Sequence, residues 1–548
     1  MAEKKQPKQA KGHPRHTAVP FAKTELWLSG ISGQLMYWII GAGIIFALLL
    51  FNARILETDD GLYIESGFYY AQNFFGYYFT SSAALYVMFL ALPIALFGIN
   101  VLLLKSLSIV FYAVGMYFLF RSFNGRIPSV VFLPAFAITA LNTTILSYAS
   151  LTFTESFYMM LQSAFFFVFL RQLGKESVES QQPQKNLYGW FSVGLTLILL
   201  SLTKNIAVAA VGAAAAYFLF FKQYKNAAAV IVAYALFWIA TGLLKTLLWG
   251  DLAGNQYGGQ SRMLLLKNPY DPNSGTESFG GFIDRFTGNA QIFLSSRFME
   301  ILGLRGENSQ PDVIVTLVIA AAILFGLYRM MVNKEKVLLT AAFYAVVVSL
   351  VTFIALHTSW GQTRYIMIFT PFFLITILYG AYDLMKTYDA PLLRMIFVVL
   401  TVGLLGLNAA TTMNAASTNL PTLQKNLGGD EFAGYPEEWA NYLRLSQWCA
   451  DSLETNALVA CRKPSVSFIY GRGRSFHGIY QVPSQDPDTL LQQLKRPGTT
   501  HIILDNIAGT VYRYMGTIER KYPNTFVPVR QIGYNQSAAY LFKINYPY

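Results

Sequence analysis

The chain has 548 residues, of which 54% are hydrophobic and 16% aromatic, and its mean hydropathy is +0.39. This composition is too apolar for a soluble globular protein, and charged residues make up only 13% of the sequence. The net charge of +12 could suggest a nucleic-acid partner, but the basic residues occur in short clusters between apolar runs, where they orient membrane spans. We therefore expect a polytopic α-helical membrane protein that binds no nucleic acid.

Apolar runs of membrane-spanning length recur from the N-terminus to about residue 412. The first follows a basic arm and precedes no small-residue cleavage site, so we expect it to remain as an anchor. The run at 82–98 is interpreted as interfacial or re-entrant, because a crossing there would place every later basic cluster outside. Eleven spans are then predicted, with the N-terminus cytoplasmic, at approximately 35–52, 101–120, 128–147, 154–171, 187–203, 205–221, 226–248, 312–330, 337–356, 363–382 and 391–412.

This topology places the unusual polar residues on the outer side. The stretch Glu57-Thr58-Asp59-Asp60-Gly61-Leu62-Tyr63 follows the first span, and two adjacent carboxylates at a membrane surface gain nothing from lipid. The alternative is a solvated loop with incidental charge. The outer side also receives Glu155, Lys204 and Arg364-Tyr365. A transporter would instead scatter ionisable groups through mid-membrane positions, so transport or lipid flipping is the weaker alternative.

The acidic motif after the first span resembles that of the first outer loop in GT-C glycosyltransferases, especially the protein O-mannosyltransferases and the bacterial aminoarabinose transferases that modify lipid A. Features that agree in order and spacing are the juxtamembrane run 82–98, Lys105, Glu155 in Leu-Thr-Phe-Thr-Glu-Ser-Phe-Tyr, and Arg364-Tyr365 followed by Pro371. The resemblance covers about residues 30–400. Two departures are the absence of proline in Phe79-Thr80-Ser81-Ser82 and a lysine, Lys204, where many relatives carry arginine.

The resemblance implies an enzyme with the GT-C fold in the bacterial cytoplasmic (inner) membrane. Such an enzyme transfers one sugar, with inversion, from a polyprenyl-phosphate donor to a protein hydroxyl, lipid A or another envelope glycan on the outer face. Its partners are that donor, membrane lipid and the acceptor. An oligosaccharyltransferase or an O-antigen ligase, which uses a diphosphate-linked glycan, is the alternative within the same class.

This chemistry requires few protein groups. The leaving phosphate needs electrostatic support, whereas the acceptor hydroxyl needs a base, for which Asp59 is the candidate. Asp60 would orient the acceptor, bind a divalent cation (Mg²⁺ or Mn²⁺), or raise the pKa of Asp59 by repulsion. Glu155 is either a second catalytic acid and a possible metal ligand, or an acid favoured by a helix N-terminus. No cofactor is certain.

Four residues are candidates for binding the donor phosphate: Lys105, Lys204, Arg364 and Tyr365. A guanidinium binds phosphate oxygens in pairs and stays charged in low dielectric, which favours Arg364. The alternatives are an interfacial anchor for Arg364 and a snorkelling side chain for Lys204. His357 is expected to have a structural role, and the five histidines and two cysteines show no zinc-ligand spacing.

Residues 1–412 are therefore predicted to form the transmembrane domain, and residues 413–548 an extracytoplasmic α/β domain. In the latter we expect helices at 437–453, 487–494 and 510–521 and strands at 457–461, 501–505, 526–531 and 538–542, arranged as a three-layer sheet. Cys449 and Cys461 either form a disulfide or are two buried thiols. The outer loop 249–311 is too long for a simple connection. Its amphipathic part, 279–304, either lies along the interface and covers the donor tail or the acceptor, or contacts a partner, or packs as ordinary structure.

Overall fold

The computed structural model describes residues 21–55, 59–176, 184–253, 263–269, 274–307, 309–388, 390–479, 486–507 and 510–547. Glu57 and Thr58 of the acidic motif lie outside the described residues, as do the N-terminal basic arm and the polar stretch 254–262 of the outer loop.

Six helices are long and apolar enough to cross a membrane, counted among the described residues: α1 (Ala22–Leu49), α4 (Val101–Phe123), α10 (Tyr224–Trp249), α14 (Val313–Val332), α15 (Lys336–Ala355) and α18 (Pro391–Leu427). A seventh crossing is added if α5 (Ser129–Ala140) and α6 (Thr143–Ala149), which are bent by 53°, form one broken span. The protein therefore has the helices of a multi-pass membrane protein.

The other predicted spans also coincide with helices. These are α7 (Thr154–Glu176), α8 (Gln184–Thr203), α9 (Ala209–Phe220) after a 3₁₀ turn at Asn205–Val208, and α17 (Thr370–Tyr388) after the short α16 (Arg364–Met367). Eleven crossings and their orientation stay predictions. The last helix, α18, continues to Leu427, so the predicted domain boundary at 412 falls inside a continuous helix.

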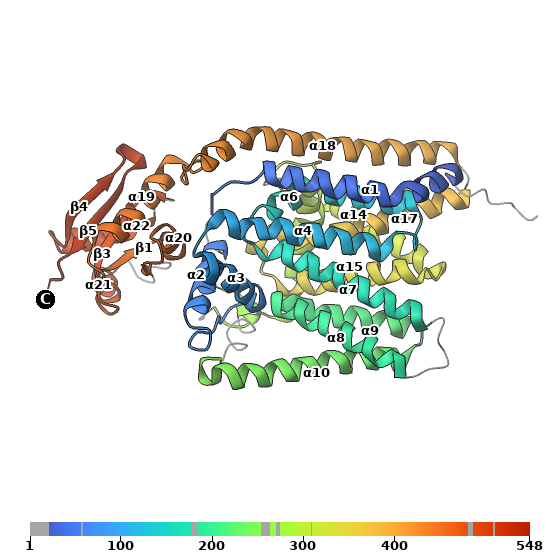
Figure 1. The fold of residues 1–548 in the computed structure, drawn as a ribbon, viewed down its shortest axis with the longest axis horizontal. Helices are drawn as coiled ribbons and strands as arrows, with labels where there is room; N and C mark the ends of the chain where they lie inside the picture. Colours follow the sequence, from blue (N-terminus) through green and yellow to red (C-terminus); the bar gives the residue numbers. More distant parts are fainter. Residues whose placement is uncertain are drawn as a thin grey trace, which may run out of the picture.

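One end of the bundle carries several shorter elements. Figure 1 shows α2 (Asp59–Gln72), α3 (Ala84–Phe97) and the C-terminal domain at this end, and the start of α1 at the opposite end. The predicted interfacial run is α3, which packs against α2. The amphipathic part of the outer loop forms α12 (Phe279–Ala290), a π-helical segment at Gln291–Arg297 and α13 (Phe298–Ile301).

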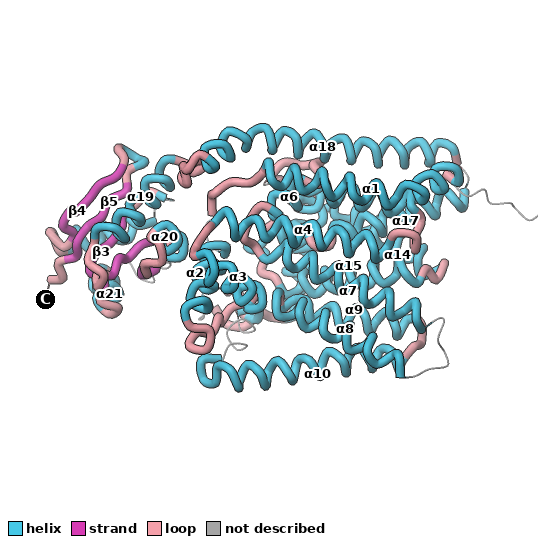
Figure 2. The backbone as a smooth tube through the Cα atoms, viewed as in Figure 1, coloured by secondary structure: helices cyan, strands magenta, loops and turns pink. Residues whose placement is uncertain are grey.

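The C-terminal domain contains a five-stranded sheet in the order β2-β1-β3-β5-β4. Figure 2 draws the strands of this domain in magenta. Strands β1, β2 and β3 run parallel, and β5 is antiparallel to β3 and β4. Its elements are α19 (Glu437–Ser452), β1 (Leu458–Cys461), α20 (Pro464–Tyr470), β2 (Phe476–Gly478), α21 (Pro487–Lys495), β3 (Thr499–Leu504), α22 (Thr510–Lys521), β4 (Phe526–Ile532) and β5 (Ala539–Ile544).

Helices cover both faces of this sheet. In β1, Val459 and Cys461 pack with the side of α19 and α20, whereas the intervening Ala460 packs with α21 and α22. The predicted three-layer arrangement is thus confirmed. The sequence patterns did not predict α20 and β2, because seven and three residues are too few to show a periodicity.

Cys449 and Cys461 are free and buried, so the structure has the second of the two arrangements considered for them. Burial raises the pKa of each thiol to about 12. The Cys461 thiol donates a hydrogen bond to Ser467 Oγ over 3.5 Å.

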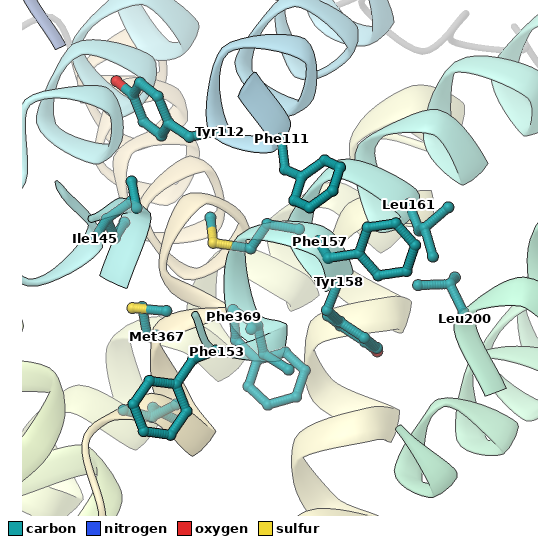
Figure 3. Close-up of a cluster of buried hydrophobic side chains, with 14 of the residues drawn as sticks. Phe111, Tyr112, Ile145, Phe153, Phe157, Tyr158, Leu161, Leu200, Met367 and Phe369 are labelled. Carbon is teal, nitrogen blue, oxygen red and sulfur yellow. The ribbon is translucent and has the colours of Figure 1, made fainter. Parts of the chain in front are cut away.

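Aromatic side chains dominate the core of the bundle. Figure 3 shows Phe111 of α4 facing Phe157 of α7, and their ring centroids are 4.9 Å apart. Phe153, which precedes α7, belongs to the same cluster, and it also touches the site described next. The core therefore supports the start of α7 directly.

Candidate active site

The first acid of the motif meets the late arginine. Asp59 is the first residue of α2, where the helix N-terminus favours a negative charge. Its Oδ2 lies 2.5 Å from Nη1 of Arg364, the first residue of α16. The Arg364 side chain is 13% exposed and that of Asp59 33%, so solvent and a ligand can reach the pair from the Asp59 side.

A second ion pair lies at the start of α7. Glu155 is fully buried, and its Oε1 is 2.6 Å from Nζ of Lys204, which stands between α8 and the following 3₁₀ turn. Thr154 Oγ1 donates to the other carboxylate oxygen over 3.5 Å. A carboxylate buried in this way requires a cationic partner, because an uncompensated buried charge is strongly destabilising.

The ring of Tyr365 joins the two ion pairs. The Arg364 guanidinium lies 5.1 Å from the ring centroid and the Lys204 ammonium 5.8 Å from it. Arg364 also donates to the Tyr365 hydroxyl over 3.3 Å, and it lies 5.3 Å from the ring of Phe153. Five of the seven predicted catalytic and phosphate-binding residues therefore form one constellation, in which two cations flank one aromatic ring and each cation is paired with an acid.

Asp60 and Lys105 belong to a second, buried group. Both side chains are fully buried and interact electrostatically with each other. Lys105 Nζ donates to the carbonyls of Asn52 (2.7 Å) and Arg54 (2.5 Å), and Asp60 accepts a hydrogen bond from the Gly61 amide over 3.0 Å. Successive residues in a helix point about 100° apart, which accounts for the different directions of Asp59 and Asp60.

A divalent cation does not fit the predicted pair of ligands well. Asp60 and Glu155 each lie beside an ammonium group, Lys105 and Lys204 respectively. In the part of the chain that the structure describes, no group of three or more His, Cys, Asp or Glu side chains is placed to hold a metal ion.

Tyr63 is a site residue that the sequence analysis did not identify. It is buried one helical turn after Asp59, and burial raises its pKa well above 10, with the charges of Asp59 and Glu155 as the next causes. Its ring packs edge-on against the rings of Phe79 and Tyr86. The spacing of four residues between Asp59 and Tyr63 on one helix was the available signal.

Arg297 and Glu300 also bear on the site, through the turn that precedes Arg364. Glu300 accepts hydrogen bonds from Thr363 Oγ1 (2.9 Å) and Arg297 Nη1 (2.8 Å), and Arg297 Nε donates to the Gly361 carbonyl (2.7 Å). The π-helical segment and α13 thus hold this turn in place. The outer loop consequently contributes to the site, whereas the sequence left its role open.

His357 has the structural role predicted for it. Its Nδ1 lies 2.7 Å from Ser359 Oγ, and its Nε2 lies 3.0 Å from the Lys267 carbonyl.

No protein-family model matches this sequence, and no curated protein matches it. Solved structures do match over almost the whole chain. Archaeal oligosaccharyltransferase AglB from Archaeoglobus fulgidus, in complex with an inhibitory peptide and a dolichol-phosphate, has a TM-score of 0.55 and 10% identity, covering 93% of this chain and 74% of that one. ArnT from Cupriavidus metallidurans bound to undecaprenyl phosphate has a TM-score of 0.54 and 12% identity, covering 92% and 97%. The apo form of ArnT has a TM-score of 0.53 and 12% identity, covering 93% and 98%. The chain therefore has the fold of the GT-C glycosyltransferases.

Proposed function

We propose that this protein is a membrane glycosyltransferase that transfers a single sugar from a polyprenyl-phosphate donor to a hydroxyl group of a lipid, glycan or protein acceptor. The observation that carries the proposal is the Arg364–Tyr365–Lys204 cluster with Asp59 at its exposed edge. Two cations around one ring suit the donor phosphate, which leaves as a phosphate monoester, and an adjacent carboxylate suits an acceptor hydroxyl. The dolichol-phosphate and undecaprenyl phosphate bound by the similar structures support this choice of donor.

The proposed reaction is a single displacement with inversion at the anomeric carbon. Asp59 takes the proton of the acceptor hydroxyl as its oxygen bonds to that carbon. The bond between the carbon and the phosphate oxygen breaks, and its electron pair stays on the phosphate, where Arg364 and Lys204 stabilise the added charge. Glu155 holds Lys204 in position through their ion pair.

Donor binding in this mechanism exchanges partners within the site. In the structure, the Asp59 carboxylate is paired with the Arg364 guanidinium, at 2.5 Å between Oδ2 and Nη1. The donor phosphate needs the same guanidinium. When the phosphate takes Arg364, Asp59 loses its cationic partner and becomes available to the acceptor. The base is therefore released by the binding of the donor, which limits unproductive chemistry in the empty site.

The proposed location is the bacterial cytoplasmic membrane, with the active site and the C-terminal domain on the outer face. The N-terminal basic arm and the inner basic clusters support this orientation. A reporter that is active only outside the cytoplasm, fused after Tyr548, should be active, and one fused before Met1 should not. Activity of a cytoplasmic reporter at the C-terminus would contradict both the topology and the site.

An oligosaccharyltransferase is the second candidate, because the AglB structure has a TM-score of 0.55 to this chain. Coverage favours the first candidate: this chain spans 97% of the ArnT chain but 74% of the AglB chain.

Sugar transfer by the purified protein tests the proposal. In detergent or liposomes, the wild-type protein should release undecaprenyl phosphate from undecaprenyl-phosphate-linked monosaccharides and glycosylate an envelope lipid or peptide acceptor, as measured by mass spectrometry. A diphosphate-linked oligosaccharide, run in parallel, should not serve as donor. Transfer from the diphosphate donor alone would support the oligosaccharyltransferase, and turnover of neither donor across a panel of sugars would overturn the proposal.

A further inference from the structure

The segment that leads into the acidic motif, residues 52–55 (the approach segment), is held by side chains from distant parts of the chain. From the membrane domain, Lys105 donates to the carbonyls of Asn52 and Arg54. Its ammonium is fully buried, and it also lies 3.3 Å from Asn52 Oδ1, so its donors are occupied by this segment. Lys105 is therefore placed to shape the approach segment and not to grip a phosphate.

A polar stripe along α18 holds the same segment from another side. Asn408, Thr412, Asn419 and Asn426 follow one another at intervals of four, seven and seven residues, which places them on one face of the helix. Asn419 Nδ2 donates to the Leu49 and Phe51 carbonyls (2.9 and 2.8 Å), and Asn426 Oδ1 accepts from the Ala53 amide (2.8 Å). Asn408, Thr412 and Asn426 are buried, although the most apolar stretch of this helix is largely exposed.

The N-terminal part of this stripe, Asn408 and Thr412, contacts the break between α5 and α6. Asn142, at the N-cap of α6, donates to Asn408 Oδ1 over 2.7 Å, and Thr412 donates to the Leu141 carbonyl over 2.9 Å. Helix α6 leads to the start of α7, where Glu155 lies. One helix thus contacts the approaches to both acids of the site.

Two tyrosines of the C-terminal domain also bond to the backbone of the approach segment. The Tyr435 hydroxyl accepts from the Ile55 amide (2.6 Å) and donates to the Ile55 carbonyl (3.1 Å). The Tyr470 hydroxyl donates to the Ala53 carbonyl (3.2 Å), and the two tyrosine oxygens are 3.0 Å apart. A pair of hydrogen bonds to one residue fixes the direction of the backbone, and Ile55 precedes Asp59 by only four residues.

The C-terminal domain also packs directly on α2, the helix that begins with Asp59. The Cβ of an alanine at Gly61 would lie 3.3 Å from Val466 Cγ2 and 3.4 Å from the Val466 backbone nitrogen, so α20 packs closely against α2 at this glycine. The first turn of α2 is therefore confined between α20 and the bundle.

We propose that Lys105, the polar stripe of α18 and the Tyr435–Tyr470 pair are positioning residues that fix the orientation of Asp59. The C-terminal domain is on this account a part of the catalytic apparatus and not a separate binding module. The role of Asp59 in this inference rests on the proposed function. The hydrogen bonds that fix the approach segment do not depend on it. A misplacement of a catalytic group by about 1 Å can lower turnover by up to about a hundredfold.

Tyr435→Phe tests the inference with the least structural change. Its matched control is Tyr442→Phe, because Tyr442 lies in the same C-terminal domain, where it is fully buried, and its hydroxyl bonds to Ser467 over 2.7 Å and not to the approach segment. We expect kcat to fall about tenfold in Tyr435→Phe, with the Kd for undecaprenyl phosphate and the Tm close to those of the control. Equal kcat in the two variants, or a loss of kcat matched by equal losses in Kd and Tm, would overturn the inference.

A second pair of variants examines α18. Asn419→Leu removes the contacts to the approach segment, whereas Asn414→Leu makes the same change at an exposed position of the same helix. We expect only Asn419→Leu to lower kcat without weakening the binding of undecaprenyl phosphate. Equal kcat in both variants would contradict a positioning role for the stripe.

Hydrogen exchange separates this inference from the proposed function. The Ile55 amide donates to the Tyr435 hydroxyl, so Tyr435→Phe should speed the exchange of that amide by about fivefold, the effect of losing a bond worth about 1 kcal/mol. Unchanged exchange of the Ile55 amide would refute the positioning role of Tyr435, even if sugar transfer is observed. Faster exchange in a protein that transfers no sugar would refute the proposed function alone.

Discussion

Asp59→Asn should lower turnover by about two to four orders of magnitude while the binding of donor becomes tighter. The loss follows from the removal of a positioned general base, since asparagine keeps the shape but cannot accept the proton. The tighter binding follows from the ion pair with Arg364, which the donor phosphate must displace in the wild-type protein. A partly exposed pair is worth about 1 kcal/mol, so we expect about fivefold lower Kd.

Two measurements check this result: single-sugar transfer at saturating donor, and the Kd for undecaprenyl phosphate. Asp284→Asn is a suitable control, because Asp284 is an exposed acid on α12 at the same end of the bundle. Near-normal turnover in Asp59→Asn would refute its role as the base. A weaker affinity for undecaprenyl phosphate, with turnover lost, would instead refute the exchange of partners at Arg364.

Arg364→Gln should weaken the binding of undecaprenyl phosphate by about one to two orders of magnitude. Hydrogen bonds to a charged group contribute about 1.5–3 kcal/mol each, and the substitution removes the guanidinium that would make them. Arg364→Lys should recover only part of the affinity, because an ammonium cannot bind two oxygens in a plane or lie flat against the rings of Tyr365 and Phe153.

The same variant must be distinguished from a folding defect, since Arg364 is largely buried. The control is Arg305→Gln, which breaks a more exposed ion pair with Asp312 in the outer loop. A parallel decline in Tm and affinity for Arg364→Gln, beyond that of the control, would indicate that Arg364 acts as a structural anchor.

The membrane helices could be predicted because an apolar run of spanning length is a strong signal. Asp59, Glu155, Lys204 and Arg364 could be predicted to lie on one side because each stands near a span end, but the sequence did not show that they form ion pairs. The grouping of Lys105 with the phosphate-binding residues could not be tested by sequence. A lysine at the start of a span has the same pattern whether it faces a ligand or, as here, backbone carbonyls of a neighbouring loop.

The positioning contacts were beyond prediction for a different reason. Asn419 and Tyr435 meet residues that precede them by more than 360 positions, and no local pattern encodes such a pairing. The four-residue spacing of Asp59 and Tyr63 is visible in the sequence. It places the two residues on one helix face only if the helix begins at Asp59, and the sequence did not show where the helix begins.

The pairing of each cation with an acid makes the empty site a weak binder of small soluble anions. Arg364 with Asp59 and Lys204 with Glu155 sum to no net charge, so small anions from the surrounding water find little unbalanced attraction there. Free phosphate would have to separate an ion pair with no other source of binding energy. A phosphate carried on a long hydrocarbon chain is instead kept at the membrane by that chain, at about 0.8 kcal/mol per methylene buried in the bilayer, so it meets the site at a high local concentration. The neutral resting site can thus discriminate between a lipid-borne phosphate and a soluble one without any contact that reads the lipid itself.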